Sequence, residues 1–339
     1  MPTPTHDFEA LPTDTHAPSF RQELRVIGVL IAFVALLEVI ARILAPNLDY
    51  DRKHIFAFPQ IITGLNQRSQ QSDRPRVVFL GNSLMRSGLN EAIFSDELQK
   101  LNAPGIESAK ITPVGTAMID WLYLYRKYFE PLTTKPDALI VGFYTHHIHD
   151  QEPIKIRRLS RHFVAKSDFP ELWTTDLDGF HEIVQSALCG VSALEGDQPE
   201  HQLSILSGMV SNYQAGLKIN NRLVANPTAK SARRKATPDI TTAPEPPPET
   251  FQRMERFIKT CQADGVSLYF VAMPQPHHWN INPEAIQLTQ RHGIEILDAT
   301  SIDAITEADF EDGYHLGPSG TEKFSRWLAA QLAGKLRTQ

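Results

Sequence analysis

The chain has 339 residues, of which 42% are hydrophobic, and a net charge of -6 from 39 acidic and 33 basic residues. This length allows one large α/β domain or two small ones, and the acidic balance provides no basic surface for phosphates, so nucleic acid is not an expected partner. Two cysteines, Cys189 and Cys261, are too few for a disulfide framework, and without a Cys/His zinc spacing no metal is expected.

The N-terminal part predicts a disordered tail and then a membrane-spanning helix. Residues 1–25 form the tail, because this segment is rich in Pro, Thr and acidic residues and has little apolar periodicity. Residues 26–45, VIGVLIAFVALLEVIARILA, carry only two charges, Glu38 and Arg42, and are long enough to cross a bilayer as a helix. These charges lie four residues apart and can pair on one helical face. The alternative is a buried amphipathic helix; a cleaved signal peptide fits less well.

The orientation of this helix is only weakly indicated by charge. Arg21 and Arg25 before it are balanced by Arg52 and Lys53 after it. We expect a single-pass protein of the cell membrane with its N-terminus inside and its body extracytoplasmic, on the periplasmic or outer face. Residues 46–75 are predicted to be a tether with a little local structure.

Residues 76–339 are predicted to form one domain of alternating strands and helices. Short apolar runs rich in β-branched and aromatic residues are typical of strands that are covered on both faces. The strand runs are 76–83, 137–144, 267–274 and 294–300, with a weaker one at 108–115; the helical patterns are 90–102 after an Asn90 cap, 116–129, 250–265 after a Thr250 cap, and 318–336. This alternation predicts a three-layer α/β/α domain with a flavodoxin-like parallel sheet and functional groups at the carboxyl ends of its strands.

One insertion, residues 151–250, interrupts the alternation. Its first part, to about residue 225, has scattered apolar and aromatic residues and is expected to form helices or a lid. Residues 226–250 are mostly Pro, Thr and charged residues with little to bury, so we predict a disordered surface segment. The insertion is expected to decorate one domain and not to separate two.

Three residues have the pattern of a serine nucleophile and its partners. Ser83 follows the first strand in GNSLM, and Asp312 and His315 lie three residues apart in EDGYHLGPSG before the last helix. A serine hydroxyl needs an imidazole to accept its proton, and the imidazole needs a carboxylate to fix its tautomer. The alternatives are that Ser83 caps a turn, Asp312 forms an Asx turn and His315 is a half-buried loop residue.

The ordered pair of motifs, VFLGNSLM and DGYHLGPSG, resembles the first and last blocks of the SGNH hydrolase superfamily, also called GDSL. The resemblance implies an SGNH-like fold with Ser83 as nucleophile, His315 as general base and Asp312 as the acid that orients it. Gly115 in PVGTAM resembles the second-block glycine, whose N–H joins that of Ser83 in stabilising an oxyanion; its simpler interpretation is a tight turn. No cofactor is implied.

The third block of that superfamily usually reads G-x-N-D, whereas this chain has VGFYTHH, with Tyr144 where the asparagine would be. Either Tyr144, Thr145 or His146 replaces this oxyanion donor, or the chemistry is altered. The missing asparagine and the N-terminal span resemble the membrane-anchored branch, the relatives of the D-alanyl transfer protein of teichoic acid synthesis and of proteins that acetylate exported polysaccharides. That resemblance implies acyl transfer beside a membrane-bound O-acyltransferase.

The predicted function is therefore a membrane-anchored serine esterase or O-acyltransferase that acts on an acyl ester of an exported or cell-surface glycan, or on a small ester. The expected partners are this membrane-bound O-acyltransferase and, through the N-terminal helix, membrane lipid. One alternative is a catalytically silent protein that binds a glycan or serves as a scaffold in an acyltransferase complex. Another is a soluble esterase whose N-terminal helix packs in the core.

Two histidine-rich stretches follow predicted strands. The first, THHIHD, contains His146, His147, His149 and Asp150, and the interpretations are a metal site, the lining of a substrate or oxyanion pocket, or a solvated loop. The second, MPQPHHWN, places His277, His278 and Trp279 at the same rim. His278 and Trp279 suit a sugar or acyl pocket, and a structural tryptophan is equally consistent with the pattern.

Overall fold

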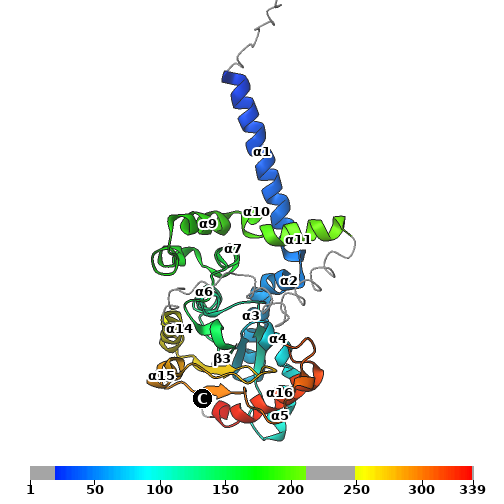
Figure 1. Cartoon of the computed structure of the whole chain (residues 1–339), viewed down its shortest axis with the longest axis vertical. Helices are drawn as coiled ribbons and strands as arrows, with labels where there is room; N and C mark the ends of the chain where they lie inside the picture. The colour runs from blue at the N-terminus through cyan, green and yellow to red at the C-terminus, as the bar shows by residue number, and fades with distance from the viewer. Residues whose placement is uncertain (1–19, 211–248, 338–339) are drawn as a thin grey trace, which may run out of the picture.

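The structure, a computed structural model, describes residues 20–210 and 249–337 (Figure 1). The predicted tail up to residue 19, and residues 226–248 of the segment predicted to be disordered, lie outside the described residues. A five-stranded parallel sheet with the strand order β2-β1-β3-β4-β5 forms the centre of the described part. The strands are β1 (Arg76–Leu80), β2 (Glu107–Ile111), β3 (Ala138–Phe143), β4 (Ser267–Ala272) and β5 (Ile296–Asp298).

All five strands lie where the sequence predicts them, and both faces of the sheet are covered. Along β1 the side chains alternate between two cores: Val78 and Leu80 belong to one, Val77 and Phe79 to the other. The first core is completed by α3 (Phe58–Ser72), α6 (Met118–Tyr128), α14 (Gln252–Ala263) and α15 (Pro283–Arg291), and the second by α4 (Ser83–Gly88), α5 (Glu91–Lys100) and α16 (Pro318–Leu332). The predicted three-layer α/β/α architecture is confirmed.

Residues 46–75, expected to be a tether, instead form helices that belong to the domain. α2 (Tyr50–Phe56) is followed directly by α3, and both contribute apolar side chains to the first core. These side chains are Ile55, Phe58, Ile62 and Leu65, each at most 4% exposed. Their spacing of three or four residues is that of one helical face. Phe56 and Ile61 between them are also apolar and Pro59 interrupts the run, so this face was not evident in the sequence.

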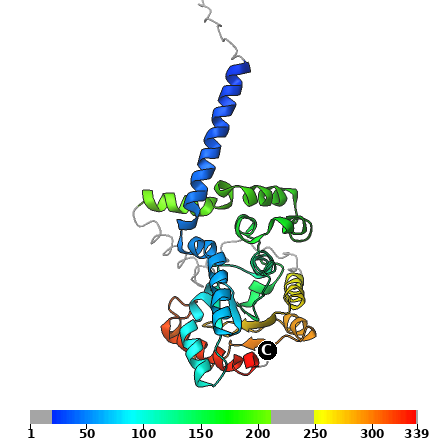
Figure 2. The ribbon, with the colours of Figure 1, turned by 180° about the vertical axis from the view of Figure 1, so that it is seen from behind.

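α1 (Phe20–Leu44) begins within the predicted tail, covers the predicted span and ends in the short turn η1 (Ala45–Asn47). Ala41 is the one buried residue of this helix. The alternative of a helix buried in the core is therefore not what the structure shows. Figures 1 and 2 show α1 projecting from one end of the molecule. By length and composition it could cross a membrane.

The described part of the insertion is helical and lies between α1 and the sheet in both views (Figures 1 and 2). It contacts α6 on one side and α1 on the other. Its elements are α7 (Ile156–Arg158), η3 (Leu159–Phe163), η4 (Lys166–Asp168), α8 (Phe169–Glu171), η5 (Leu172–Asp176), α9 (Phe180–Val191), α10 (Ala193–Gly196) and α11 (Gln198–Met209). Three short turns complete the described elements: η2 (Thr145–Ile148), η6 (Glu307–Asp309) and η7 (Lys335–Arg337).

Candidate active site

Ser83 is the first residue of α4, directly after β1. The N-cap of this helix is Asn82, whose Oδ1 accepts the backbone N–H of Leu84 at 3.0 Å. The interpretation of Ser83 as the capping residue is therefore wrong, and its hydroxyl has a different partner. The backbone N–H of Ser83 is among those that the first turn of a helix leaves without an intrahelical acceptor.

The hydroxyl of Ser83 meets His315, although the two residues are 232 positions apart in the chain. Ser83 Oγ lies 2.9 Å from His315 Nε2, and His315 Nδ1 lies 2.7 Å from Asp312 Oδ2. Because an ionised carboxylate can only accept hydrogen bonds, Nδ1 carries the ring proton, and Nε2 of the neutral imidazole faces the serine as an acceptor. The three residues predicted from the motifs are thus in one hydrogen-bonded chain.

Asp312 is held by its own loop. Its Oδ1 accepts the backbone N–H groups of Tyr314 at 3.0 Å and His315 at 2.7 Å, and Gly313 between them has a φ of 77°. Partial burial by itself raises the pKa of Asp312, but the hydrogen bonds from His315 and Tyr314 outweigh it and hold the pKa below its usual value. The Asx turn and the contact to the imidazole therefore occur together and are not alternatives.

Gly115 lies in a turn that is bonded to the turn carrying Ser83. Its φ of 62° is in the left-handed region that favours glycine. The next residue, Thr116, donates from Oγ1 to Gly81 O at 3.1 Å and accepts from Asn82 Nδ2 at its carbonyl, also at 3.1 Å. β1 and β2 are in register up to Leu80 and Ile111, so the two turns leave the sheet at the same level. This arrangement places two backbone segments with candidate oxyanion donors side by side.

The turn that contains Gly115 is also held by residues from α2 and the insertion, which the sequence analysis did not identify. Asp51 of α2 accepts the N–H of Val114 at 2.8 Å, and the carbonyl of Val114 accepts from Arg158. Lys155 donates to the carbonyl of Gly115. Asp51 also pairs with Arg158 at 2.5 Å, so α2 and the insertion meet at this turn. No local pattern in the sequence signals these contacts.

His147 of the THHIHD stretch occupies the region of the altered third block, and the sequence did not predict its contact with Asn82. His147 Nδ1 lies 3.1 Å from Asn82 Nδ2 and 3.1 Å from the backbone nitrogen of Tyr144, which donates to it. Burial lowers the pKa of His147 to about 3, with a further contribution from His146, so the ring is neutral. The imidazole therefore supports the N-cap residue next to Ser83.

Tyr144, Tyr314 and Trp279 form an aromatic wall beside the catalytic candidates. The ring centroid of Tyr144 lies 6.2 Å from that of Tyr314 and 5.2 Å from that of Trp279. Trp279 is 7% exposed and donates from Nε1 to the carbonyl of Met273 at 3.0 Å, which makes it part of the core. His278 is exposed and lies near Asn280.

The THHIHD cluster does not converge on one point: the ring centroids of His146 and His147 lie 4.7 Å apart, whereas His149 and Asp150 contact other residues. His146 is exposed, His149 lies 3.4 Å from Glu249, and Asp150 caps α14 by accepting the N–H groups of Gln252 and Arg253. The predicted cap of α14, Thr250, instead donates to Asp150 at 2.7 Å. Among residues 20–210 and 249–337, no group of three or more His, Cys, Asp or Glu side chains could hold a metal ion.

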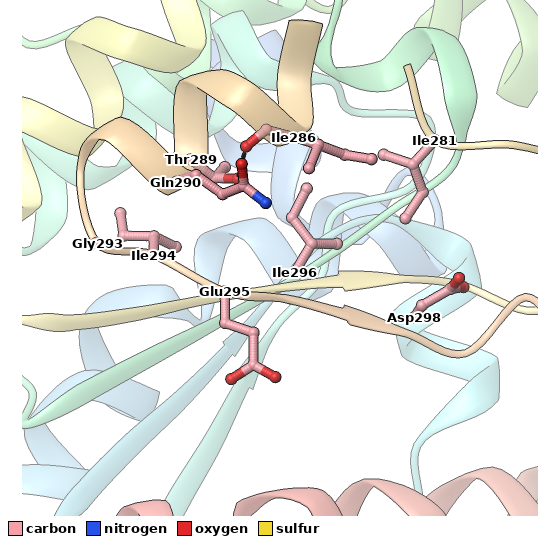
Figure 3. A pocket seen from close by; sticks show the side chains of 9 residues that line it. All are labelled: Ile281, Ile286, Thr289, Gln290, Gly293, Ile294, Glu295, Ile296 and Asp298. Carbon is pink, nitrogen blue, oxygen red and sulfur yellow. Dashed lines mark hydrogen bonds between the residues drawn. The ribbon is translucent and has the colours of Figure 1, made fainter. Parts of the chain in front are cut away.

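A separate hollow of about 470 Å³ lies between α15 and the edge strand β5 (Figure 3). Apolar residues such as Ile286 and Ile296 line it, together with Glu295 and Asp298. Ser83, Asp312 and His315 are not among its lining residues. The hollow is therefore distinct from the site around Ser83.

Comparisons with known proteins do not assign the chain to a family. No protein-family model matches it, and no curated protein matches it. A solved structure that it matches is the lipase/acylhydrolase from Enterococcus faecalis, with 13% sequence identity over 77% of this chain and 96% of that chain and a TM-score of 0.32. A likeness at this score carries no argument, so the site rests on its own geometry.

Proposed function

We propose that the chain is a membrane-anchored serine enzyme that transfers or hydrolyses an acyl group of an ester. The observation that carries this proposal is the hydrogen-bonded series from Ser83 Oγ through His315 to Asp312, with 2.9 Å and 2.7 Å between the paired atoms. The same arrangement of hydroxyl, imidazole and carboxylate serves acyl transfer on unrelated folds. Its place at the carboxyl edge of a parallel sheet is where open α/β proteins bind their ligands.

The reaction proceeds in two halves. Ser83 Oγ attacks the ester carbonyl while its proton passes to His315 Nε2, and Asp312 stabilises the imidazolium. The tetrahedral intermediate then collapses, and the alcohol leaves with the proton from His315. Water or a glycan hydroxyl attacks the acyl-enzyme, gives its proton to His315 and restores Ser83 as the acid or the new ester departs. No cofactor takes part in these steps.

The negative charge of each intermediate is stabilised by backbone N–H groups of Ser83 and Gly115. This role for Gly115 is supported by its left-handed φ and by the bonds that join its turn to Asn82 and Gly81. The absence of the third-block asparagine is expected to cost about a hundredfold in rate, because one oxyanion donor has roughly this effect. A slow reaction suits an enzyme whose substrate is concentrated at a surface.

The substrate that we propose is an acyl ester of an exported or cell-surface glycan, with the domain on the extracytoplasmic side and a membrane-bound O-acyltransferase as partner. The support for the membrane part is α1, whose apolar side chains from Val26 to Leu44 are largely exposed. Thirteen large apolar side chains exposed to water between Val26 and Leu44 would be unfavourable, whereas lipid accommodates them. The glycan and the partner are the parts of the proposal that follow from the motif resemblance.

The test is covalent labelling of the full chain, reconstituted in lipid nanodiscs, with a fluorophosphonate probe and location of the adduct by mass spectrometry. We expect an adduct on Ser83 that is lost in Ser83→Ala and His315→Ala. Ser87→Ala, on the same short helix, is the matched control and should label like the unsubstituted chain. If the folded unsubstituted chain stays unlabelled, the enzyme proposal fails, and a binding or scaffold role takes its place.

A further inference from the structure

The end of the molecule from which α1 leaves carries an unusual number of exposed apolar side chains. On α9, Phe180, Val184, Leu188 and Val191 are 82%, 39%, 52% and 67% exposed. Their spacing of three or four residues places them on one face of the helix. The described residues offer no partner for this stripe. Scattered exposed apolar residues are normal, but a contiguous stripe indicates a contact surface.

The opposite face of α9 is well packed, so the stripe is not the result of a loosely held helix. Ser186 and Cys189 are fully buried. Ser186 Oγ lies 2.8 Å from Ser160 Oγ and accepts Trp173 Nε1–H at 3.1 Å. The helix therefore presents a defined face to the outside.

α11 also exposes apolar side chains. Ile205 and Met209 are 61% and 77% exposed and lie four residues apart, on one helical face. The first turn of α11 is fastened to α2 by Arg52, which lies 2.6 Å from Glu200. In Figures 1 and 2, α9, α10 and α11 lie across the base of α1.

The junction between α1 and α9 is fixed by Glu38. Its carboxylate accepts hydrogen bonds from Ser192 Oγ at 2.9 Å, Ala193 N at 2.7 Å and Leu194 N at 3.2 Å. Arg42 pairs with Glu38 at 2.8 Å and donates to the carbonyl of Val191. The two charges that interrupt the apolar run of α1 are thus used where the helix reaches the domain.

This junction fixes the position along α1 at which α9 is attached. Residues 20–37, which precede the junction, rise about 27 Å as a helix, close to the roughly 30 Å of a hydrocarbon core. The corner between α1 and α9 is a groove of about 540 Å³ lined mainly by apolar residues, among them Leu30, Val34 and Val191. The groove and the stripe on α9 are continuous through Val191.

We propose that the outer faces of α9 and α11 lie in the interface of the lipid bilayer, so that the domain rests flat on the membrane around α1. This inference rests on the proposed membrane span of α1. Helices with an apolar face lie in the bilayer interface with that face among the upper acyl chains, and the groove beside Leu30 and Val34 is filled by lipid. We assign the bilayer as the partner of this surface, because the apolar stripe of α9 adjoins the apolar surface of α1 at the height where the hydrocarbon core would end.

Spin labelling of the full chain in vesicles of phosphatidylcholine and phosphatidylglycerol tests this proposal. Nitroxides at Val184→Cys and Leu188→Cys report contact with lipid through their accessibility to oxygen relative to a water-soluble nickel complex. The two native cysteines are buried, so the unsubstituted chain gives the background. Lys259→Cys on α14, whose side chain is 62% exposed, is the control in water, and Val29→Cys, 67% exposed on α1, is the control in lipid.

The expected result is an oxygen-to-nickel ratio at Val184 and Leu188 that is several-fold higher than at Lys259 and lower than at Val29. A ratio equal to that at Lys259, with Val29 in lipid, shows the stripe in water, which overturns the inference and leaves the span intact. If Val29 is also in water, the membrane proposal itself has failed. Dipolar broadening at Leu188 would show that a second copy covers the stripe and would likewise overturn the inference.

A second variant tests whether lipid contact is lost when the apolar stripe is made charged. Leu188→Glu places a charge on the exposed stripe and is not expected to disturb the packed face of α9. With a label at Val184→Cys, we expect this charge to reduce the ratio to near the value at Lys259, while a label at Val29→Cys is unaffected. An unchanged ratio at Val184 contradicts the proposal.

Discussion

The ring of His147 lies 3.1 Å from the side-chain amide of Asn82, the residue that caps the helix beginning with Ser83. In His147→Ala, the buried Asn82 loses this neighbour and a cavity forms, so we expect the free energy of unfolding to fall by about 1–3 kcal/mol. Labelling of Ser83 by the fluorophosphonate should slow as well. Denaturant unfolding and labelling rates measure the two effects. His146→Ala, at the exposed neighbour, should change neither.

Buried neutral histidines make the fold sensitive to acid. Burial lowers the pKa of His147 to about 3 and that of His162 to about 4, the latter against the opposing effect of Asp197. In the unfolded chain the pKa is near 6.5, so between these values the unfolded state binds more protons and stability falls as the pH falls. Each such histidine contributes a slope of up to about 1.4 kcal/mol per pH unit.

Denaturant midpoints between pH 7.5 and 5 measure this loss, which should begin as the pH drops through about 6.5. His147→Asn removes one of these titrating groups and should reduce the dependence. A midpoint that is constant over this range would contradict the prediction.

Asp312 orients the imidazole of His315, and its lowered pKa keeps it ionised at neutral pH. Asp312→Asn keeps the shape but removes the charge, so labelling of Ser83 should slow by about two to four orders of magnitude. Glu311→Gln, one residue earlier and exposed, is the matched control. Equal rates for the two variants would remove Asp312 from the proposed mechanism.

Asp51 connects α2 to the Gly115 turn and to two arginines. It accepts the N–H of Val114 at 2.8 Å and pairs with Arg86 at 2.7 Å and Arg158 at 2.5 Å. In Asp51→Asn, two half-buried guanidinium groups lose their carboxylate, and we expect a loss of about 2–4 kcal/mol in unfolding free energy together with slower labelling. Asp49→Asn, which alters only the cap of α2, should cost about 1 kcal/mol or less and leave labelling unchanged.

Gly142 of β3 permits the close approach of α4. A Cβ there would lie 2.6 Å from Met85 Cε and 2.9 Å from Met273 Sδ. Gly142→Ala should therefore destabilise the fold by about 1–3 kcal/mol, because the buried Met85 and Met273 side chains must repack. Gly208→Ala has open space around its added carbon and should be neutral or slightly stabilising. Thermal unfolding of the two variants compares them directly.

The sheet and the hydrogen-bonded series of Ser83, His315 and Asp312 were predictable from the sequence because their signals are local. Strands covered on both faces are apolar throughout, and GNS and DGYH each place their polar groups within one turn. The pairing of Ser83 with His315 could be inferred because parallel strands bring their carboxyl ends to one edge.

The supports of the site were not predictable, because they come from contacts between distant segments. Asp51 and Val114 are 63 residues apart, and Asp150 caps a helix that begins a hundred residues later. The expected cap, Thr250, is the residue that a local pattern favours. The helical face of residues 55–65 was missed because Phe56 and Ile61 blur its apolar periodicity and Pro59 and Gly64 weaken the helical pattern.

The replacement of a flexible tether by packed helices has a consequence for how the enzyme would meet its substrate. α1 ends at Leu44, and Asp51, seven positions later, is already bonded to the turn of Gly115. Even a fully extended chain of this length reaches no more than about 25 Å. A domain on a long flexible linker can reach many positions above the membrane, and its effective concentration at any one of them falls as the linker lengthens. If α1 spans a bilayer and Ser83 is the nucleophile, as proposed, Ser83 lies at a fixed height above the membrane, and it reaches only acyl groups presented at that height.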